Sequence, residues 1–134
     1  MNVQKLTQKS IEAVQAAHSL AVEHNNPEVR QEHLLAALLG QQDGLIGSLL
    51  AGMGVDVRAM AGACAAAVER LPGVSGSTAE NVYLNRELDA ALTAAEKRAE
   101  KMGDAYVSVE HLFLGLLEKP SAETKKLFQA HSVT

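Results

Sequence analysis

The sequence EHLLAALL at residues 32–39 returns as EHLFLGLL at residues 110–117. The two histidines, His33 and His111, are therefore 78 residues apart, and this offset aligns the flanking sequence without a gap. At this offset the following residues are identical: Leu6 and Leu84, Ala13 and Ala91, Ala17 and Ala95, Ala21 and Ala99, Val29 and Val107, Leu49 and Leu127, Val55 and Val133. Self-similarity at a constant offset indicates a duplicated structural unit. The chain is predicted to contain two copies of a unit of about 78 residues.

Capping residues and glycines divide the first copy into four predicted helices. Thr7 is expected to cap the first helix, in which small and apolar residues recur every three or four positions up to about His24. The other predicted helices run from about Gln31 to Leu39 before Gly40, from Leu45 to Met53 before Gly54, and from the cap Asp56 to Arg70.

The second copy repeats three of these helices. They are predicted from the cap Asn85 to Met102 before Gly103, from the cap Ser108 through the second octamer, and from about Ser121 to His131. Because Asp56 aligns with Thr134, the fourth helix of this copy is missing, and we expect the chain to be a fragment of a longer polypeptide. The predicted organisation is one domain over residues 1–134, with unit one at 1–71, a mobile Pro/Gly/Ser-rich linker at 72–83 and a truncated unit two at 84–134.

The composition favours an all-α fold. The chain has 134 residues, enough for one domain with a conventional core. Apolar residues make up 47% but aromatic residues only 3%, while 22 residues are alanine, so the core is expected to be aliphatic with closely packed helices. Alanine, leucine, glutamate, lysine and glutamine favour helices, and this composition argues against disorder and against an all-β fold.

Charge and cysteine content exclude several classes of function. The net charge is −4 and the basic residues are scattered, so we expect no nucleic-acid partner. A single cysteine cannot form an internal disulfide, and no signal peptide opens the chain. The longest apolar stretch, residues 59–68, is well below the ~20 residues that span a bilayer. We therefore expect a cytoplasmic protein that does not bind membranes.

The duplicated four-helix unit, with Glu-His-Leu at the start of its second helix, resembles the Clp N-terminal domain, which precedes the ATPase rings of Clp AAA+ chaperones. The linker LPGVSG at residues 71–76 and the opening LTQKS at residues 6–10 are most similar to the ClpB disaggregase branch. The resemblance covers the whole chain and implies an all-α fold of two tandem pseudo-symmetric units. It also implies a substrate-contacting module tethered above a hexameric, ATP-driven machine.

No enzymatic activity is expected in the chain itself. It contains no G-x-x-x-x-G-K-[ST] loop that could hold nucleotide phosphates. The resemblance therefore implies that ATP and Mg²⁺ bind to other domains of the parent protein. No cofactor is expected in this fragment.

Glu32 and Glu110 occupy the same first-turn position in the two copies, and two explanations stay open. A carboxylate there is stabilised by the partial positive charge of the helix N-terminus, by up to about 1 kcal/mol. Alternatively, the two acids flank a groove between the units and attract a cationic side chain or a peptide amine.

The resemblance adds functional roles for several positions. In ClpB relatives the residues matching Thr7, Asp104 and Glu110 are implicated in handling substrate polypeptide, and for Thr7 this role is compatible with capping. In ClpC relatives the acids matching Glu32 and Glu110 bind phosphoarginine. Those relatives place Gly-Thr before Glu-His, whereas this chain has RQ at residues 30–31 and SV at 108–109, which argues against phosphoarginine recognition.

The repeated histidines and the single cysteine have simpler explanations than catalysis or metal binding. Two imidazoles complete neither a structural nor a catalytic zinc site, so His33 and His111 are expected to form hydrogen bonds within their own units. Cys64 lies in an alanine-rich segment without a basic partner and is expected to be a small core residue.

Apolar residues where the units meet are candidates for contact with polypeptide, although most such residues belong to a core. Leu92, Tyr106 and Val107, with Leu6 and Val3, are predicted to line a groove at this seam. Tyr106 is the strongest candidate because it is one of four aromatic residues and offers a flat apolar ring with a polar tip.

Three hypotheses follow. The first is a noncatalytic module that binds unfolded or aggregated polypeptide weakly and passes it to ATPase rings, in a monomeric domain of a homohexameric parent. The second is a docking site for a folded adaptor protein, as in ClpA and ClpC unfoldases. The third is an independent small enzyme, for which the sequence supplies no triad, metal set or phosphate loop.

Overall fold

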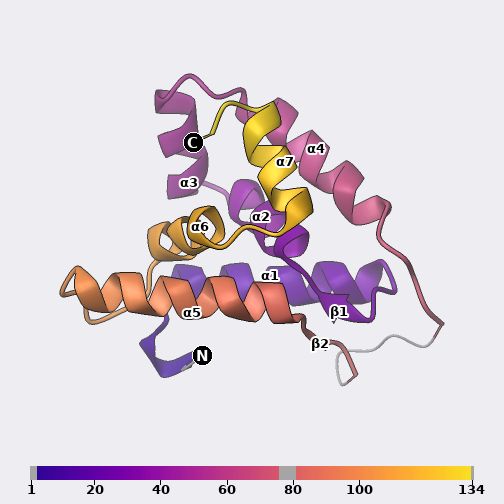
Figure 1. Cartoon of the computed structure of the whole chain (residues 1–134), viewed down its shortest axis with the longest axis horizontal. Helices are drawn as coiled ribbons and strands as arrows, with labels where there is room; N and C mark the ends of the chain where they lie inside the picture. Colours follow the sequence, from indigo (N-terminus) through magenta and orange to yellow (C-terminus); the bar gives the residue numbers. More distant parts are fainter. Residues whose placement is uncertain (1–2, 76–80, 134) are drawn as a thin grey trace.

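The computed structural model describes residues 3–75 and 81–133 and confirms the all-α class. Within these residues the helices of unit one are α1 (Gln8–Glu23), α2 (Gln31–Gly40), α3 (Leu45–Gly52) and α4 (Val57–Glu69). Those of unit two are α5 (Arg86–Lys101), α6 (Val109–Glu118) and α7 (Ala122–Ala130). A short 3₁₀ turn η1 (Val3–Lys5) and the strands β1 (Glu28–Val29) and β2 (Tyr83–Leu84) complete the described elements (Figure 1).

The predicted caps explain where the helices begin and end. Thr7 accepts from the Ser10 N–H at 3.2 Å, and Asn85, the equivalent residue of unit two, accepts from the Leu88 N–H at 2.8 Å. Each bond satisfies an N–H that has no partner within the helix. Beyond the ends of α3 and α5, Gly54 and Gly103 have φ of 86° and 74°, a conformation that favours glycine.

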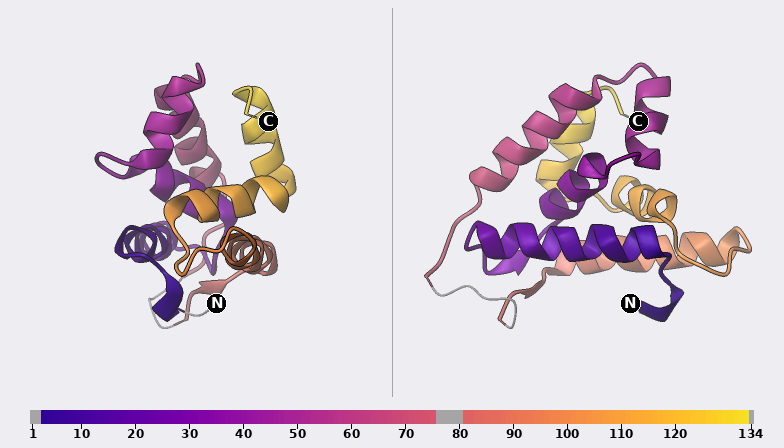
Figure 2. Two further views of the ribbon diagram at one scale, coloured as in Figure 1. Left: turned by 90° about the vertical axis from the view of Figure 1, so that its left-hand side faces the viewer. Right: turned by 180° about the vertical axis from the view of Figure 1, so that it is seen from behind.

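The helices form a layered arrangement. The two long helices, α1 and α5, run along one side of the domain and stand apart from each other, with α2 packed on α1 and α6 packed on α5, and α3, α4 and α7 cover the far side (Figures 1 and 2). The long helices present small side chains to this packing, because every fourth residue is a buried alanine: Ala13, Ala17 and Ala21 in α1, and Ala91, Ala95 and Ala99 in α5. Small residues let helices approach closely, as the composition predicted.

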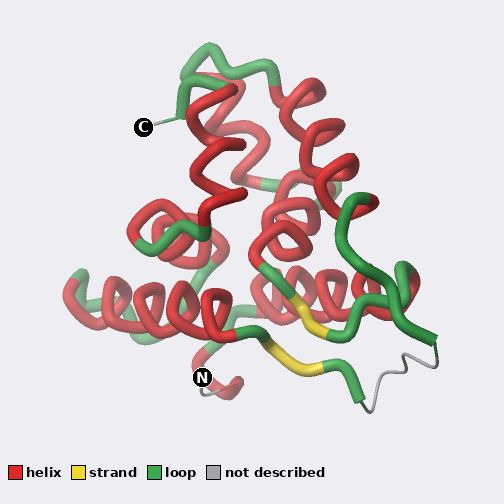
Figure 3. Tube along the Cα trace, turned by 45° about the vertical axis from the view of Figure 1, so that its right-hand side comes forward, coloured by secondary structure: helices red, strands yellow, loops and turns green. Residues whose placement is uncertain are grey.

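The two units exchange short extended segments. β1 and β2 pair in parallel, with Val29 opposite Leu84, and Figure 3 shows the two strands side by side. An isolated parallel bridge joins Leu6 to Val107, which are the repeat equivalents of Leu84 and Val29. Each unit therefore lends its first segment to the other unit, and this exchange ties the two copies into one body.

The cross-unit pairing also anchors the long helices at their N-termini. The Thr7 N–H donates to the Val107 carbonyl at 3.1 Å, and the Asn85 N–H donates to the Val29 carbonyl at 3.0 Å. The N-caps of α1 and α5 are thus both held by the opposite unit, as a pseudo-twofold relation requires.

Gln31 adds a connection between the units that has no symmetric counterpart. Its side chain is 1% exposed; Nε2 donates to the carbonyls of Glu87 and Lys119 at 2.9 and 2.8 Å, and Oε1 accepts from the Ser121 N–H at 2.9 Å. The equivalent residue of unit two is Val109, which cannot form such bonds. One amide therefore links α2 to the start of α5 and to the α6–α7 turn.

Part of the predicted linker is anchored to unit one. The Pro72 carbonyl accepts from Asn26 Nδ2 at 3.2 Å, and the Val74 N–H donates to the Asn25 carbonyl at 2.7 Å. Tyr83, the last predicted linker residue, lies in β2. Residues 76–80 lie outside the described residues.

Within residues 3–75 and 81–133, no single helix has the length and apolar character needed to cross a membrane. Among the described helices, α2 and α3 taken together satisfy the length and composition criterion, but they are bent by 84° at the break between them. Most residues of α2 are buried in the core.

Candidate functional site

Four of the predicted site residues lie together around the N-terminus of α6. Thr7 and Glu110 line a hollow of about 450 Å³ between the start of α1 and the α2–α3 connection. Asp104, Tyr106 and Glu110 line an adjoining hollow of about 340 Å³, together with Met102. We call the part of the chain that lines these two hollows the Glu110 surface, because Glu110 belongs to both.

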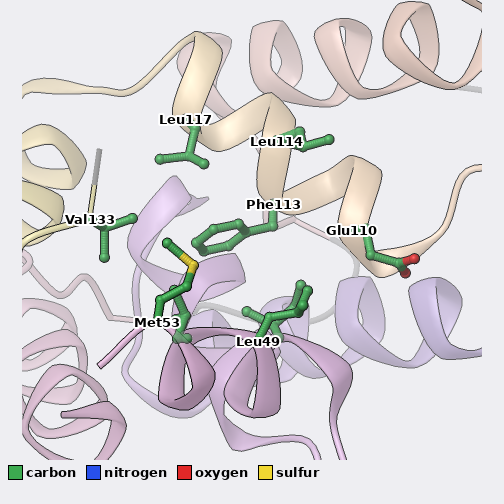
Figure 4. Close-up of a pocket in the computed structure, with 9 residues that line it drawn as sticks. Leu49, Met53, Glu110, Phe113, Leu114, Leu117 and Val133 are labelled. Carbon is green, nitrogen blue, oxygen red and sulfur yellow. The ribbon is translucent and has the colours of Figure 1, made fainter. Parts of the chain in front are cut away.

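Glu110 also borders a third, apolar hollow of about 300 Å³ between α3 and α6. Figure 4 shows Leu49 from α3 and Met53 from its C-cap facing Phe113, Leu114 and Leu117 from α6, with Glu110 at one end of the row. In unit one, α4 packs on α2 and touches α7. In the repeat, α6 is the equivalent of α2, and α3 is the equivalent of α7. The apolar hollow is therefore the counterpart of the surface that α4 covers in unit one.

Thr7 serves as a cap in the structure, and its hydroxyl is held by neighbouring groups. Besides capping α1, its Oγ1 donates to Ser10 Oγ at 3.0 Å, and that hydroxyl donates to the Val107 carbonyl at 2.9 Å. The side chain is half-buried at the edge of the first hollow. The capping role is confirmed, and a role in contact with polypeptide stays a prediction.

The repeated histidines form hydrogen bonds within their own units, as predicted. His111 Nδ1 accepts from the Ser108 N–H at 2.9 Å, and His111 Nε2 donates to Asp104 Oδ2 at 2.9 Å. The equivalent His33 Nδ1 accepts from the Arg30 N–H at 2.8 Å, and Nε2 donates to Asn26 Oδ1 at 2.8 Å. In both rings the proton on Nε2 follows from Nδ1 accepting a backbone N–H.

The environment of His33 keeps its ring neutral. The ring is 0% exposed, and burial, reinforced by the charges of His24 and Arg30, lowers the pKa of His33 to about 4. Since the ring must remain an acceptor at Nδ1, neutrality is also what the hydrogen bonds require.

Glu32 and Glu110 share a repeat position but not an environment. Glu32 is 4% exposed, and burial raises its pKa, so it cannot meet a ligand from solvent in this structure. Glu110 is half-buried and borders all three hollows. Of the two predicted acids, only Glu110 is therefore placed for contact with a partner.

The structure corrects the position of two apolar candidates. Leu92 and Val107 are each 2% exposed and belong to the core, because α6 covers α5 and the bridge to Leu6 covers Val107. Leu92 therefore does not face solvent, and Val107 only borders a small hollow of about 60 Å³ beside Asp104. Tyr106, by contrast, is 59% exposed at the second hollow.

Met102 belongs to the Glu110 surface but was not among the predicted site residues. It is 57% exposed and lines the second hollow beside Tyr106. Periodicity could not identify it, because Met102 follows Ala99 by three residues and so continues the buried stripe of α5, and it is exposed because it lies at the C-cap, beyond the last residue of the helix.

The remaining reactive groups do not form a site. Cys64 is 0% exposed, and burial raises the pKa of its thiol to about 12, so the thiol is a core group as predicted. In the described ranges, no three or more histidine, cysteine or acidic side chains come close enough together to hold a metal ion.

Sequence comparison places these features in a known family. The family model for the Clp repeat (R) N-terminal domain matches residues 5–131. The chaperone protein ClpB of Bacillus cereus is 38% identical over 136 residues, a match that covers 100% of this chain but only 16% of that protein.

Structural comparison agrees with this result at the level of the fold. The Hsp104 N-terminal domain from Candida albicans superimposes with a TM-score of 0.86 at 21% identity, over 97% of this chain and 83% of that one. A ClpV N-domain, solved in complex with a VipB peptide, gives a TM-score of 0.72 at 22% identity, over 96% of this chain and 79% of that one. Because the family model matches residues 5–131 and the Glu-His-Leu helix is duplicated, the chain belongs to the Clp repeat N-terminal domain family.

Proposed function

We propose that this chain is the N-terminal domain of an ATP-dependent, ClpB-like chaperone and that it binds unfolded or aggregated polypeptide for transfer to the ATPase rings. Identity of 38% to ClpB over the whole chain supports the assignment to this kind of parent protein. The chain spans about 16% of the length of that relative, so ATP, Mg²⁺ and the hexamer belong to the proposal for the parent. We propose a cytoplasmic location for the same protein.

The observation that carries the proposal is the Glu110 surface. It combines exposed apolar side chains, Met102 and Tyr106, with the carboxylate of Glu110 around one hollow. Exposed apolar groups beside an acid suit a polypeptide segment that carries both apolar and basic side chains. A folded chaperone client hides such segments, whereas an unfolded one exposes them.

The same geometry supports weak binding. A solvent-exposed ion pair contributes about 0.2–1 kcal/mol, and partial burial of two exposed apolar side chains adds a few kcal/mol at most. After the entropic cost of association, such contacts leave a low affinity. Low affinity suits a domain that must release its polypeptide to an ATP-driven pore.

The proposal is tested by titrating a fluorescently labelled, permanently unfolded polypeptide and recording anisotropy at low and high salt. We expect Glu110→Gln to weaken binding and to reduce its salt dependence, because one carboxylate is removed. Glu69→Gln on α4 is the matched control, since Glu69 is exposed and borders none of the three hollows. Equal affinities for the parent and Glu110→Gln would contradict the proposal.

Docking of a folded adaptor is the second candidate. The ClpV N-domain, which shares this fold, was solved in complex with a VipB peptide, so the fold can receive a defined partner segment. An adaptor would bind with fixed stoichiometry, whereas unfolded segments of different sequence would compete for the same surface. Competition between two unrelated unfolded polypeptides supports the first candidate, and recovery of one stoichiometric folded protein supports the second.

A further inference from the structure

The two histidine networks have the same arrangement but differ in the residue that accepts from Nε2 and in the N-cap residue, which is Arg30 in unit one and Ser108 in unit two. In each unit the ring lies seven residues after its partner, accepts a backbone N–H at Nδ1 and donates from Nε2 to a side-chain oxygen. That oxygen belongs to Asn26 in unit one and to Asp104 in unit two.

Burial accounts for this difference. Asn26 is 2% exposed, where a carboxylate would be costly, and the side chain of Asp104 is 47% exposed, where a carboxylate stays hydrated. Because a neutral amide oxygen performs the same task in unit one, the negative charge of Asp104 is not needed to hold the ring.

We infer that Asp104 is a positioning residue for the Glu110 surface: its carboxylate orients the His111 ring, and the ring fixes the first turn of α6, where Glu110 stands. This inference rests on the function proposed above, and it changes the role expected for Asp104 from direct contact with polypeptide to support of a neighbouring group.

The connection from Asp104 to Glu110 is short. His111 is 4% exposed and its Nδ1 accepts from both the N–H and the hydroxyl of Ser108, at 2.9 and 3.0 Å. Ser108 is the N-cap of α6 and Glu110 is the second helical residue. Without an acceptor on Nε2, the proton can move to Nδ1. The bond from the Ser108 N–H is then lost, and the Ser108 hydroxyl must change from donor to acceptor.

The test compares Asp104→Asn with Asp104→Ala in the whole domain. Asparagine keeps an acceptor oxygen and removes the charge, whereas alanine removes both. We expect Asp104→Asn to bind the labelled unfolded polypeptide within about twofold of the parent. For Asp104→Ala we expect about fivefold weaker binding, because binding must then restore the order of the first turn of α6, at a free-energy cost similar to that of a lost helix cap.

A second measurement reads the ring directly. In the parent and in Asp104→Asn, the ¹⁵N signals of His111 should show a proton fixed on Nε2, and in Asp104→Ala they should show a mixture of tautomers. If Asp104→Asn binds as weakly as Asp104→Ala while its ring signals match the parent, the charge itself contacts polypeptide and the inference is wrong. It is also wrong if the His111 signals are the same in Asp104→Ala and the parent.

Failure of the proposed function gives a different pattern. In that case Glu110→Gln binds polypeptide like the parent, and the ring signals alone decide whether Asp104 holds His111. Circular dichroism at the assay temperature verifies that each variant is folded.

Discussion

Replacing Gln31 with alanine should destabilise the domain more than any other single polar substitution we consider. Its side chain forms three hydrogen bonds of 2.8–2.9 Å to the backbone of unit two. At a net 0.5–1.5 kcal/mol for each bond, their loss lowers the free energy of unfolding by about 3 kcal/mol. With a urea m-value of about 2 kcal/mol/M, the midpoint of denaturation falls by about 1.5 M.

Two further variants separate hydrogen bonding from packing. Gln31→Met retains most of the side-chain volume but leaves the same three backbone groups without their partner, so it should be destabilised about as much as Gln31→Ala. Gln41→Ala is the matched control, because Gln41 donates a single solvent-exposed bond to the Lys9 carbonyl and should cost less than about 1 kcal/mol. Urea denaturation followed by circular dichroism measures all three. A Gln31→Met variant as stable as the parent would refute the reasoning, since packing alone would then account for the contribution.

Three other predictions concern the core. Gly115→Ala should lower the free energy of unfolding by about 1–3 kcal/mol, because the added Cβ would overlap the Ala91 carbonyl oxygen of α5. Gly62→Ala, where α4 leaves open space, should be neutral or raise the free energy of unfolding by up to about 1 kcal/mol. Equal thermal midpoints for the two variants would contradict this difference. Burial lowers the pKa of His33 from 6.5 to about 4. Between these two pH values the unfolded chain therefore binds a proton at His33 that the folded chain does not. The stability contributed by the neutral ring is complete above pH 6.5 and is lost as the pH falls towards 4. Urea denaturation at successive pH values should show a steeper loss for the parent than for His33→Gln, and parallel curves would exclude this linkage. Cys64, with a pKa of about 12, should resist a thiol-specific reagent at pH 8 until the domain is unfolded in urea, and rapid labelling of the native domain would show that the thiol is accessible.

Local signals in the sequence were enough to predict the helices. Thr7, Asp56 and Asn85 cap helices where expected, because a capping side chain needs only the backbone within three residues of itself. The repeat likewise predicted that His33 and His111 would play equivalent structural roles, since both have their partner seven residues earlier.

Contacts between the units could not be predicted in the same way. The paired segments are two residues long, too short for an alternating pattern, and Gln31 bonds to groups 56 to 90 residues away. For the same reason the repeat could not show that Glu32 would be buried and Glu110 half-buried, because the elements around Glu32 are distant in the sequence: α4 of its own unit packs on α2, and Glu87 and Glu123 of the other unit lie near it. Leu92 illustrates the limit: a residue at a seam between amphipathic helices is apolar whether it lines a groove or fills a core.

The most direct test of binding at the Glu110 surface is a map of amide chemical shifts in the ¹⁵N-labelled domain during titration with an unlabelled, unfolded polypeptide. We predict that the largest changes in amide chemical shift occur at residues 102–111 and around Thr7. We also predict that these changes are smaller when the titration is repeated with the Glu110→Gln variant. Changes centred instead on α4, with the amides of residues 102–111 unaffected, would contradict the assignment of this surface.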